Sequence, residues 1–286
     1  MSRSQWYIIG VAVFLVLGLY AATQSQFFGV KTPVSKNLSI VAPQVGQPAG
    51  LTIDSILFHA KEPLTPQQIN RLSQLENAVT RGDVTNQKIH SFHEIARFWK
   101  DTARVFAPYA WYTAQAARLE NSEKSLTFAA RLFLEGLKNE TNPALKHWEA
   151  LQAKDLFERS LKINPSNDSS QVNLGAVYLY GGLASPMEGI NLIRKVAEKD
   201  STNIHAQMTL GEASLISGQL DKALERYINV DRLNPGNLEA IFRVAEIYER
   251  MEKPADAIKW YEKSFPYIEI PGLKQEVEKR IAQLKK

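Results

Sequence analysis

The sequence predicts an all-α protein in which helical hairpins stack into an α-solenoid behind a single membrane-spanning helix. Three observations support this fold class. From Pro66 onward the apolar residues recur with helical spacing, and no stretch shows the period-two alternation of a strand. A pattern of about 34 residues recurs along residues 89–271. Near the amino terminus, residues 6–22 form an uncharged apolar segment.

The apolar segment reads WYIIGVAVFLVLGLYAA at Trp6–Ala22, and no charged residue lies between Arg3 and Lys31. Seventeen residues of α-helix span ~25 Å, close to the ~30 Å of a bilayer's hydrocarbon core. A cleaved signal peptide is the alternative, because the segment ends in small alanines. The length of the apolar stretch and the bulky Tyr20 favour a retained transmembrane anchor within residues 1–28.

The orientation of this anchor follows from its flanking charges. Arg3 lies immediately before the apolar segment, whereas Lys31 and Lys36 lie farther away on the other side. The positive-inside rule therefore favours a cytoplasmic amino terminus. The expected location is a single-pass membrane protein whose body is extracytoplasmic, and periplasmic if the source is bacterial.

A linker is expected between the anchor and the helical body. Residues 29–65 contain several Pro and Gln, and only Leu51–Leu64 shows a brief apolar pattern, typical of a short helix. Pro66 is then expected to begin a helix that ends before Gly82.

The composition excludes several classes of function. The 34 basic and 30 acidic residues are spread along the chain, so the net charge of +4 does not indicate a nucleic-acid-binding face. The chain has no cysteine, which removes disulfides, thiolate metal sites and cysteine nucleophiles.

The clearest repeat runs from Ile204 to Asn237, IHAQMTLGEASLISGQLDKALERYINVDRLNPGN. Its first helix carries Gly211, and its second carries Ala223 and Tyr227, followed by a Pro near the end of the unit. Two antiparallel helices can cross closely only where the contact residues are small, and a bulky Tyr can fill the space beside them. This unit resembles the tetratricopeptide repeat (TPR).

The same pattern divides the body, residues 66–271, into about five units. Small residues recur at the first-helix position that Gly211 occupies and at the second-helix position that Ala223 occupies. The predicted units are residues 89–122, 123–167, 168–203, 204–237 and 238–271. About eleven extra residues in the second unit are expected to lengthen its inter-helix turn. Pro271 is expected to start a polar helix, and residues 272–286 are interpreted as a capping helix.

The resemblance implies a right-handed superhelix whose concave wall is formed by the first helices. The family's ligand-facing positions make this wall basic near its amino-terminal end, apolar in the middle and acidic at the far end. Carried over by register, the expected partner-binding residues are His90, His93, Arg97, Arg131, Val172, Asn173, Leu179, Tyr180, Met208, Glu212, Phe242, Arg243 and Glu246.

No motif indicates catalysis. His90 and His93 lie three residues apart, a spacing that permits metal binding, but no third ligand is near them in the sequence. There is no Gly-rich phosphate loop and no nucleophile motif. We therefore expect no catalytic residues, no metal, no cofactor and no small-molecule substrate.

The sequence thus favours a membrane-anchored scaffold or adaptor that binds proteins on the extracytoplasmic side of a membrane. The expected partner is a protein or peptide segment, itself associated with the membrane. The alternative is a chaperone-like module that holds unfolded substrate in an envelope maturation system of the cytochrome c biogenesis type.

Overall fold

In the computed structural model, residues 51–81, 84–183 and 185–286 are described, and these ranges contain helices and turns but no strand. The predicted anchor, residues 1–28, and residues 29–50 of the predicted linker lie outside the described residues. Within the described ranges, no helix is both long enough and apolar enough to cross a membrane.

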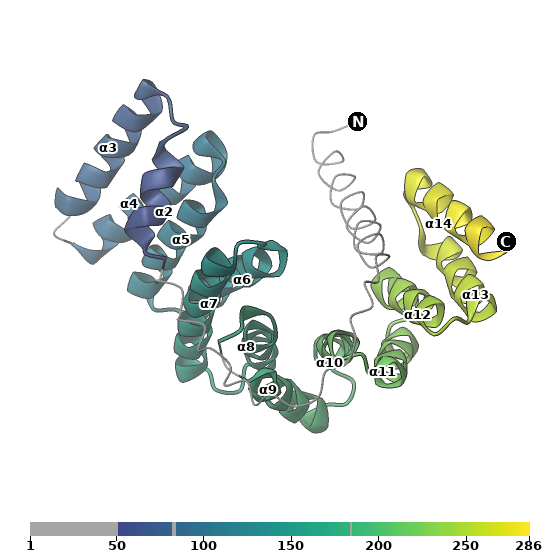
Figure 1. The fold of residues 1–286 in the computed structure, drawn as a ribbon. Helices are drawn as coiled ribbons and strands as arrows, with labels where there is room; N and C mark the ends of the chain where they lie inside the picture. The colour runs from purple at the N-terminus through teal and green to yellow at the C-terminus, as the bar shows by residue number, and fades with distance from the viewer. Residues whose placement is uncertain (1–50, 82–83, 184) are drawn as a thin grey trace, which may run out of the picture. The chain divides into compact units, whose positions relative to one another are not determined.

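The helices follow one another along the chain and are mostly joined by short turns (Figure 1). In chain order they are α2 (Ile53–Lys61), α3 (Pro66–Arg81), α4 (Thr85–Arg97), the π-helical turn η1 (Phe98–Ala103), α5 (Phe106–Glu120), α6 (Glu123–Asn139), α7 (Pro143–Ile163), α8 (Asp168–Gly181), α9 (Pro186–Lys199), α10 (Ile204–Ile216), α11 (Leu220–Leu233), α12 (Leu238–Arg250), α13 (Pro254–Ser264), the 3₁₀ turn η2 (Phe265–Tyr267) and α14 (Pro271–Leu284).

Helices α4 to α13 form five helical hairpins. We call the first helix of each hairpin the A helix (α4, α6, α8, α10 and α12) and the second the B helix (α5, α7, α9, α11 and α13). Each A helix packs against its own B helix, and each B helix that precedes another hairpin also packs against the next A helix. The neighbouring A helices α6, α8 and α10 contact one another in sequence. The predicted array of hairpins is therefore present.

A polar cap begins most of the A helices. Asn167, Asn203 and Asn237 directly precede α8, α10 and α12, and each side-chain Oδ1 accepts a hydrogen bond from the backbone N–H three residues later, at 2.8–3.0 Å. Ser122 caps α6 in the same way. Such caps satisfy backbone donors that have no partner within the helix, and each contributes ~1 kcal/mol. They fix where four of the hairpins begin.

Small residues set the distance between paired helices, as the repeat pattern predicts. A Cβ added to Gly175 of α8 would lie 2.7 Å from the carbonyl oxygen of Gly189 in α9, so these backbones nearly touch. A Cβ on Gly211 of α10 would lie 2.9 Å from the ring of Tyr227 in α11. Tyr227 is fully buried, which confirms that a bulky Tyr fills the space beside the crossing.

The extra residues of the second hairpin lengthen its helices and not its turn, which corrects the sequence expectation. Helix α6 continues to Asn139 and α7 begins at Pro143, so only three residues separate them. Asn142 caps α7 through bonds from the next two free N–H groups, and Pro143 at the first helical position needs no hydrogen-bond partner. Strong start signals therefore allow the inserted residues to continue as helix.

The first hairpin also differs from the expected unit. Its A helix begins at Thr85, before the predicted start at residue 89, and continues into the π-helical turn Phe98–Ala103. This turn ends at Arg104, whose φ of 57° lies in the left-handed region. In such a turn each backbone bond spans one more residue than in an α-helix, so the end of this A helix is wider than that of a regular repeat.

Helices α2 and α3 cover the first hairpin. Ala60 of α2 and Leu72 of α3 join a buried cluster with Ile95 of α4 and Trp99 of η1. Lys61 and Glu76 link the two covering helices through an ion pair of 2.9 Å. The short helix expected within Leu51–Leu64 is thus present.

Residues 267–286 belong to a different compact unit from residues 51–266. This unit contains α14, which starts at Pro271 as the sequence predicts and places Pro at its first turn. Val277 and Ile281, four residues apart, are its buried residues, so the helix has one apolar side and a polar remainder.

Candidate functional site

The A helices carry all of the predicted partner-binding residues, and we call the surface that they share the A-helix face. The structure places these residues at three levels of exposure. His90, His93, Arg97 and Arg131 are exposed. Half-buried are Leu179, Tyr180, Met208, Glu212, Phe242, Arg243 and Glu246. Val172 and Asn173 are buried.

Val172 is not available to a partner, contrary to its assignment by register. Its side chain has no exposed surface and packs in a cluster with Ile193, Ala206 and Leu210. The two residues Val172 and Asn173 point in directions about 100° apart on one helix. The helix therefore turns the apolar residue into the array, and only the amide can reach the A-helix face.

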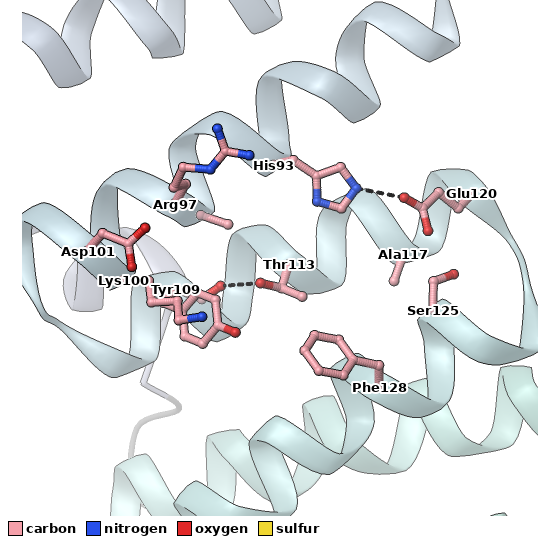
Figure 2. A pocket seen from close by; sticks show the side chains of 11 residues that line it. His93, Arg97, Lys100, Asp101, Tyr109, Thr113, Ala117, Glu120, Ser125 and Phe128 are labelled. Atoms are coloured by element: carbon pink, nitrogen blue, oxygen red, sulfur yellow. Dashed lines mark hydrogen bonds and ion pairs between the residues drawn. The ribbon is translucent and has the colours of Figure 1, made fainter. Parts of the chain in front are cut away.

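A pocket of about 280 Å³ opens on the first two hairpins. Its lining comes from α4, η1, α5 and α6, and Figure 2 shows His93 and Arg97 across the pocket from Phe128. The floor is formed by small residues, among them Ala117 and Thr113, and Phe128 contributes a ring that is 54% exposed. The pocket thus combines apolar groups, Ala96, Ala117 and the rings of Tyr109 and Phe128, with a larger number of polar and charged side chains.

Charged groups of both signs surround this pocket. His93 Nε2 lies 2.7 Å from the carboxylate of Glu120 (Figure 2). The Lys100 ammonium lies 5.7 Å from the centre of the Tyr109 ring, a cation–π distance. Burial, together with the carboxylates of Asp101 and Glu135, raises the pKa of Tyr109. Its phenol is therefore a neutral donor at the pocket wall.

Contacts between successive A helices form two rows of side chains on the A-helix face, seven residues apart. One row contains His205 and Asn173, with Nε2 of His205 3.0 Å from Oδ1 of Asn173. The other contains Lys138, Tyr180 and Glu212. In it the ammonium of Lys138 lies 5.1 Å from the Tyr180 ring centre and 4.0 Å from the Glu212 carboxylate.

In the row through Tyr180, the positive charge of Lys138 faces the negative charge of Glu212. The hydroxyl of Tyr180 is buried without a hydrogen bond of normal geometry. Burial, and then the charge of Glu212, raise the pKa of Tyr180.

A second charged pair, Arg243 and Glu246, lies on α12. Burial alone would lower the pKa of Arg243, but Glu246 and Tyr227 raise it above its ordinary value. Burial raises the pKa of Glu246 despite its 3.1 Å contact with Arg243.

Several residues of this surface were missed at the sequence level. Lys138 lies in the lengthened part of α6, where the repeat register no longer applies. Tyr109, Thr113 and Glu120 come from a B helix, which the family pattern does not assign to the wall. The exposed Phe128 is not among the missed residues, because it lies at a ligand-facing register position of its A helix, as His93 and Arg97 do.

No group of three or more His, Cys, Asp or Glu side chains within the described residues is arranged to hold a metal ion. His90 and His93, whose spacing would permit metal binding, have different surroundings. His93 contacts Glu120 and lines the pocket, whereas His90 is not part of the pocket wall.

The paired helices, the repeated Asn caps and the small residues at the crossings together decide the fold. The chain folds as a tetratricopeptide repeat array. No protein-family model and no curated protein matches the sequence. Solved structures similar to it include MamA 41-end from Desulfovibrio magneticus RS-1, with 19% identity over 65% of this chain and 96% of that chain and a TM-score of 0.45.

Two further solved structures are similar to the TPR array. PilW, described as a widely conserved type IV pilus biogenesis factor, has 18% identity over 71% of this chain and 86% of its own, with a TM-score of 0.49. YrrB, described as a TPR protein with an unusual peptide-binding site, has 17% identity over 69% of this chain and 98% of its own, with a TM-score of 0.42.

Proposed function

We propose that this TPR protein is a membrane-anchored scaffold that binds a polypeptide segment of another protein on its A-helix face, outside the cytoplasm. The observation that carries the binding role is the pocket beside Phe128. Its wall contains an aromatic ring that is 54% exposed, and its volume of about 280 Å³ suits one bulky apolar side chain. The rim of His93, Arg97 and Lys100 can hydrogen-bond a polypeptide that crosses it.

The proposed role is non-enzymatic. Two polar contacts of the A-helix face, His205 with Asn173 and Lys138 with Glu212, join neighbouring A helices, and Arg243 pairs with Glu246 within α12. Covalent catalysis requires a nucleophile paired with a base. In the pocket lining no nucleophile is paired in this way.

Photo-crosslinking tests the binding surface. A photoreactive phenylalanine analogue replaces Phe128 in the full-length chain, and in a matched control it replaces Met187 at the start of the B helix α9. These two side chains are 54% and 52% exposed, so random encounters should label them equally. Discrete adducts are expected from position 128 and not from position 187. Equal adducts at the two positions, or none at position 128, would show that the A-helix face is not the binding surface.

The membrane anchor and its orientation rest on residues 6–22 and on Arg3, and two measurements test them. The intact mass of the protein from its own membranes should include Met1 or Ser2, whereas a species starting near Thr23 would indicate a cleaved signal peptide. The chain has no cysteine, so a Lys162→Cys variant has a single thiol. A membrane-impermeant maleimide should label it in cells whose inner membrane is intact, and labelling only after lysis would contradict the proposed orientation.

A further inference from the structure

The first and second hairpins meet where α5 packs against α6 and α7, and we call this contact the α5–α7 joint. The ring of Trp111 on α5 lies 6.0 Å from that of Trp148 on α7, and Phe133 of α6 lies edge-on to Trp148 at 5.5 Å, measured between ring centres. All three rings belong to one apolar cluster. The pocket beside Phe128 has walls from α4, η1 and α5 on one side and from α6 on the other, so it spans the same joint.

A carboxyl group is enclosed in this joint. Glu149 follows Trp148 on α7 and is 2% exposed, and its Oε2 is buried without a hydrogen-bond partner. A Cβ added to Gly136 of α6 would lie 2.8 Å from Oε1 of Glu149 and 2.5 Å from Cε1 of Phe106, the first residue of α5. The carboxyl and the Phe106 ring therefore lie side by side over Gly136, whose lack of a side chain lets the three helices come this close.

No cation among the described residues pairs with this carboxyl. Two charged groups act on it, Glu140 at the end of α6 and Lys146 on α7, and their effects on its pKa are opposite. The charged residues of α5 and α8, by contrast, lie at the far ends of those helices. The other titratable side chains near the joint, on α2 and η1 and on the packed halves of α5 to α8, are Asp54, Arg104, Tyr109, Glu135, Lys138, His147, Tyr178 and Tyr180.

The enclosed carboxyl binds its proton more tightly than an exposed one. Burial, then the charge of Glu140, raises the pKa of Glu149 to about 8 from an ordinary value of 4.5, although Lys146 opposes the shift. An ionised carboxylate without a partner is costly to bury, whereas in an opened joint water can solvate it. The ratio of open to closed joint should therefore rise with pH between these two values, by up to about ten-fold per pH unit.

We propose that the Glu149 carboxyl makes the α5–α7 joint pH-dependent. When it is protonated, it stays packed beside Phe106 over Gly136, and when it ionises, the two hairpins separate more often so that water reaches it. Because the pocket beside Phe128 spans the joint, its α5 and α6 walls part in the same event. The inference goes beyond the proposed function and stands without it, since opening of the joint needs no partner.

Amide hydrogen exchange of the full-length chain in detergent tests the joint. Exchange rates are measured between pH 5.5 and pH 8 for the wild type, for Glu149→Gln and for the control Glu158→Gln. Gln is close to Glu in size and does not titrate, so the ratio of the wild-type rate to the variant rate at each pH cancels the direct effect of pH on exchange. Glu158 is an exposed residue farther along α7, so the control removes a carboxyl group outside the joint.

For amides at the start of α5, the end of α6 and the start of α7, the ratio of wild type to Glu149→Gln should rise by up to about ten-fold per pH unit. It should stay constant in α12 and α13, and the ratio of wild type to Glu158→Gln should stay constant throughout. In a Phe106→Ala background, where the covering ring is removed at a position already 40% exposed, the rise should disappear.

Three results would overturn the inference. These are a ratio that does not change with pH at the joint, an equal rise in every helix, and a rise that persists in full without the Phe106 ring. Crosslinking from position 128 tests the partner separately, so either conclusion can fail alone.

Discussion

Gly175 and Gly211 occupy equivalent positions in adjacent hairpins but face different neighbours. A Cβ on Gly175 would lie 2.7 Å from a backbone carbonyl oxygen and 2.5 Å from Cγ1 of the buried Ile193. A Cβ on Gly211 would lie 2.9 Å from the ring of Tyr227. Side chains can rotate away from a new methyl group, whereas a helix backbone can move only if the two helices separate.

We therefore predict that Gly175→Ala lowers the free energy of unfolding by ~1–3 kcal/mol and that Gly211→Ala lowers it less. The higher helix propensity of Ala offsets part of the cost at both positions. Urea denaturation of the full-length variants measures the difference. Gly272→Ala is the control, because no atom lies within 4 Å of the added Cβ. Equal losses at Gly175 and Gly211 would contradict the packing described for the two crossings.

Glu149 is a second residue whose surroundings yield a prediction. The residue is 2% exposed, its carboxyl group lies near Gly136, and its Oε2 has no hydrogen-bond partner. Burial, then the charge of Glu140, raises the pKa of Glu149 to about 8, although Lys146 opposes the shift. Because the folded state holds the proton more tightly than the unfolded state, this group's contribution to stability falls as pH rises from about 4.5 to about 8.

Replacing Glu149 with Gln should remove this pH dependence. Between pH 5 and pH 8 the wild type should lose stability relative to Glu149→Gln by at most ~1.4 kcal/mol per pH unit. Denaturation of both proteins across that range measures the slope. Parallel curves would mean that Glu149 is ionised in the folded protein.

The residues that the sequence could identify on the A-helix face are those that keep the repeat register. Phe128, Arg131 and Tyr180 lie on the surface at their register positions. Burial of Val172 could not be predicted, because it depends on Ala206 and Leu210 of the next hairpin. The role of Lys138 depends on the extra turn of α6, which a fixed repeat length does not include.

At the scale of single elements, the turns between the paired helices of the third, fourth and fifth hairpins use one conformation. Gly182, Gly218 and Glu252 are each the fifteenth residue of their units, and their φ angles are 61°, 72° and 57°. A left-handed residue ends the A helix and redirects the chain into the B helix. Gly adopts this conformation without strain, whereas an L-residue such as Glu does so at a cost of ~1–2 kcal/mol.

The fifth hairpin should therefore be stabilised by the residue that the third and fourth already have. We predict that Glu252→Gly raises the free energy of unfolding by up to ~1 kcal/mol, because relief of strain exceeds the greater chain entropy of Gly. Gly218→Ala should lower it by ~1 kcal/mol. Thermal melts of both variants test the pair, and a loss of stability in Glu252→Gly would show that its backbone is not strained.

Element boundaries were predictable where a cap or Pro marks them. Pro66, Pro254 and Pro271 begin helices, and Asn at the last position of a unit caps the next one. The π-helical turn at Phe98–Ala103 has no comparable local signal, because its extra residue is accommodated by packing of Phe98 and Trp99 into the core. The first residues of α7 were expected to belong to a lengthened turn, because the repeat spacing places the second helix later than the start signal at Asn142–Pro143 does.

At the scale of the whole molecule, the hairpins depend on their neighbours. Helix α8 packs against its partner α9, against α7 before it and against α6 and α10 on the A side. The buried clusters likewise cross hairpin boundaries, since Val172 and Val196 of the third hairpin pack with Leu210 of the fourth. The array could be predicted from the repeat alone because one rule of contact is reused along the chain.

This dependence predicts how damage should spread. If Gly175→Ala separates α8 from α9, the interfaces with α7 and α10 should weaken as well, because each hairpin buries its apolar surface largely against its neighbours. Amide hydrogen exchange of the full-length variant should therefore rise in α7, α8, α9 and α10 and stay at the wild-type rate in α4 and α13. Faster exchange in every helix would indicate that the array unfolds as one cooperative unit. Faster exchange in α8 and α9 alone would indicate that each hairpin is stable by itself, which the shared clusters argue against.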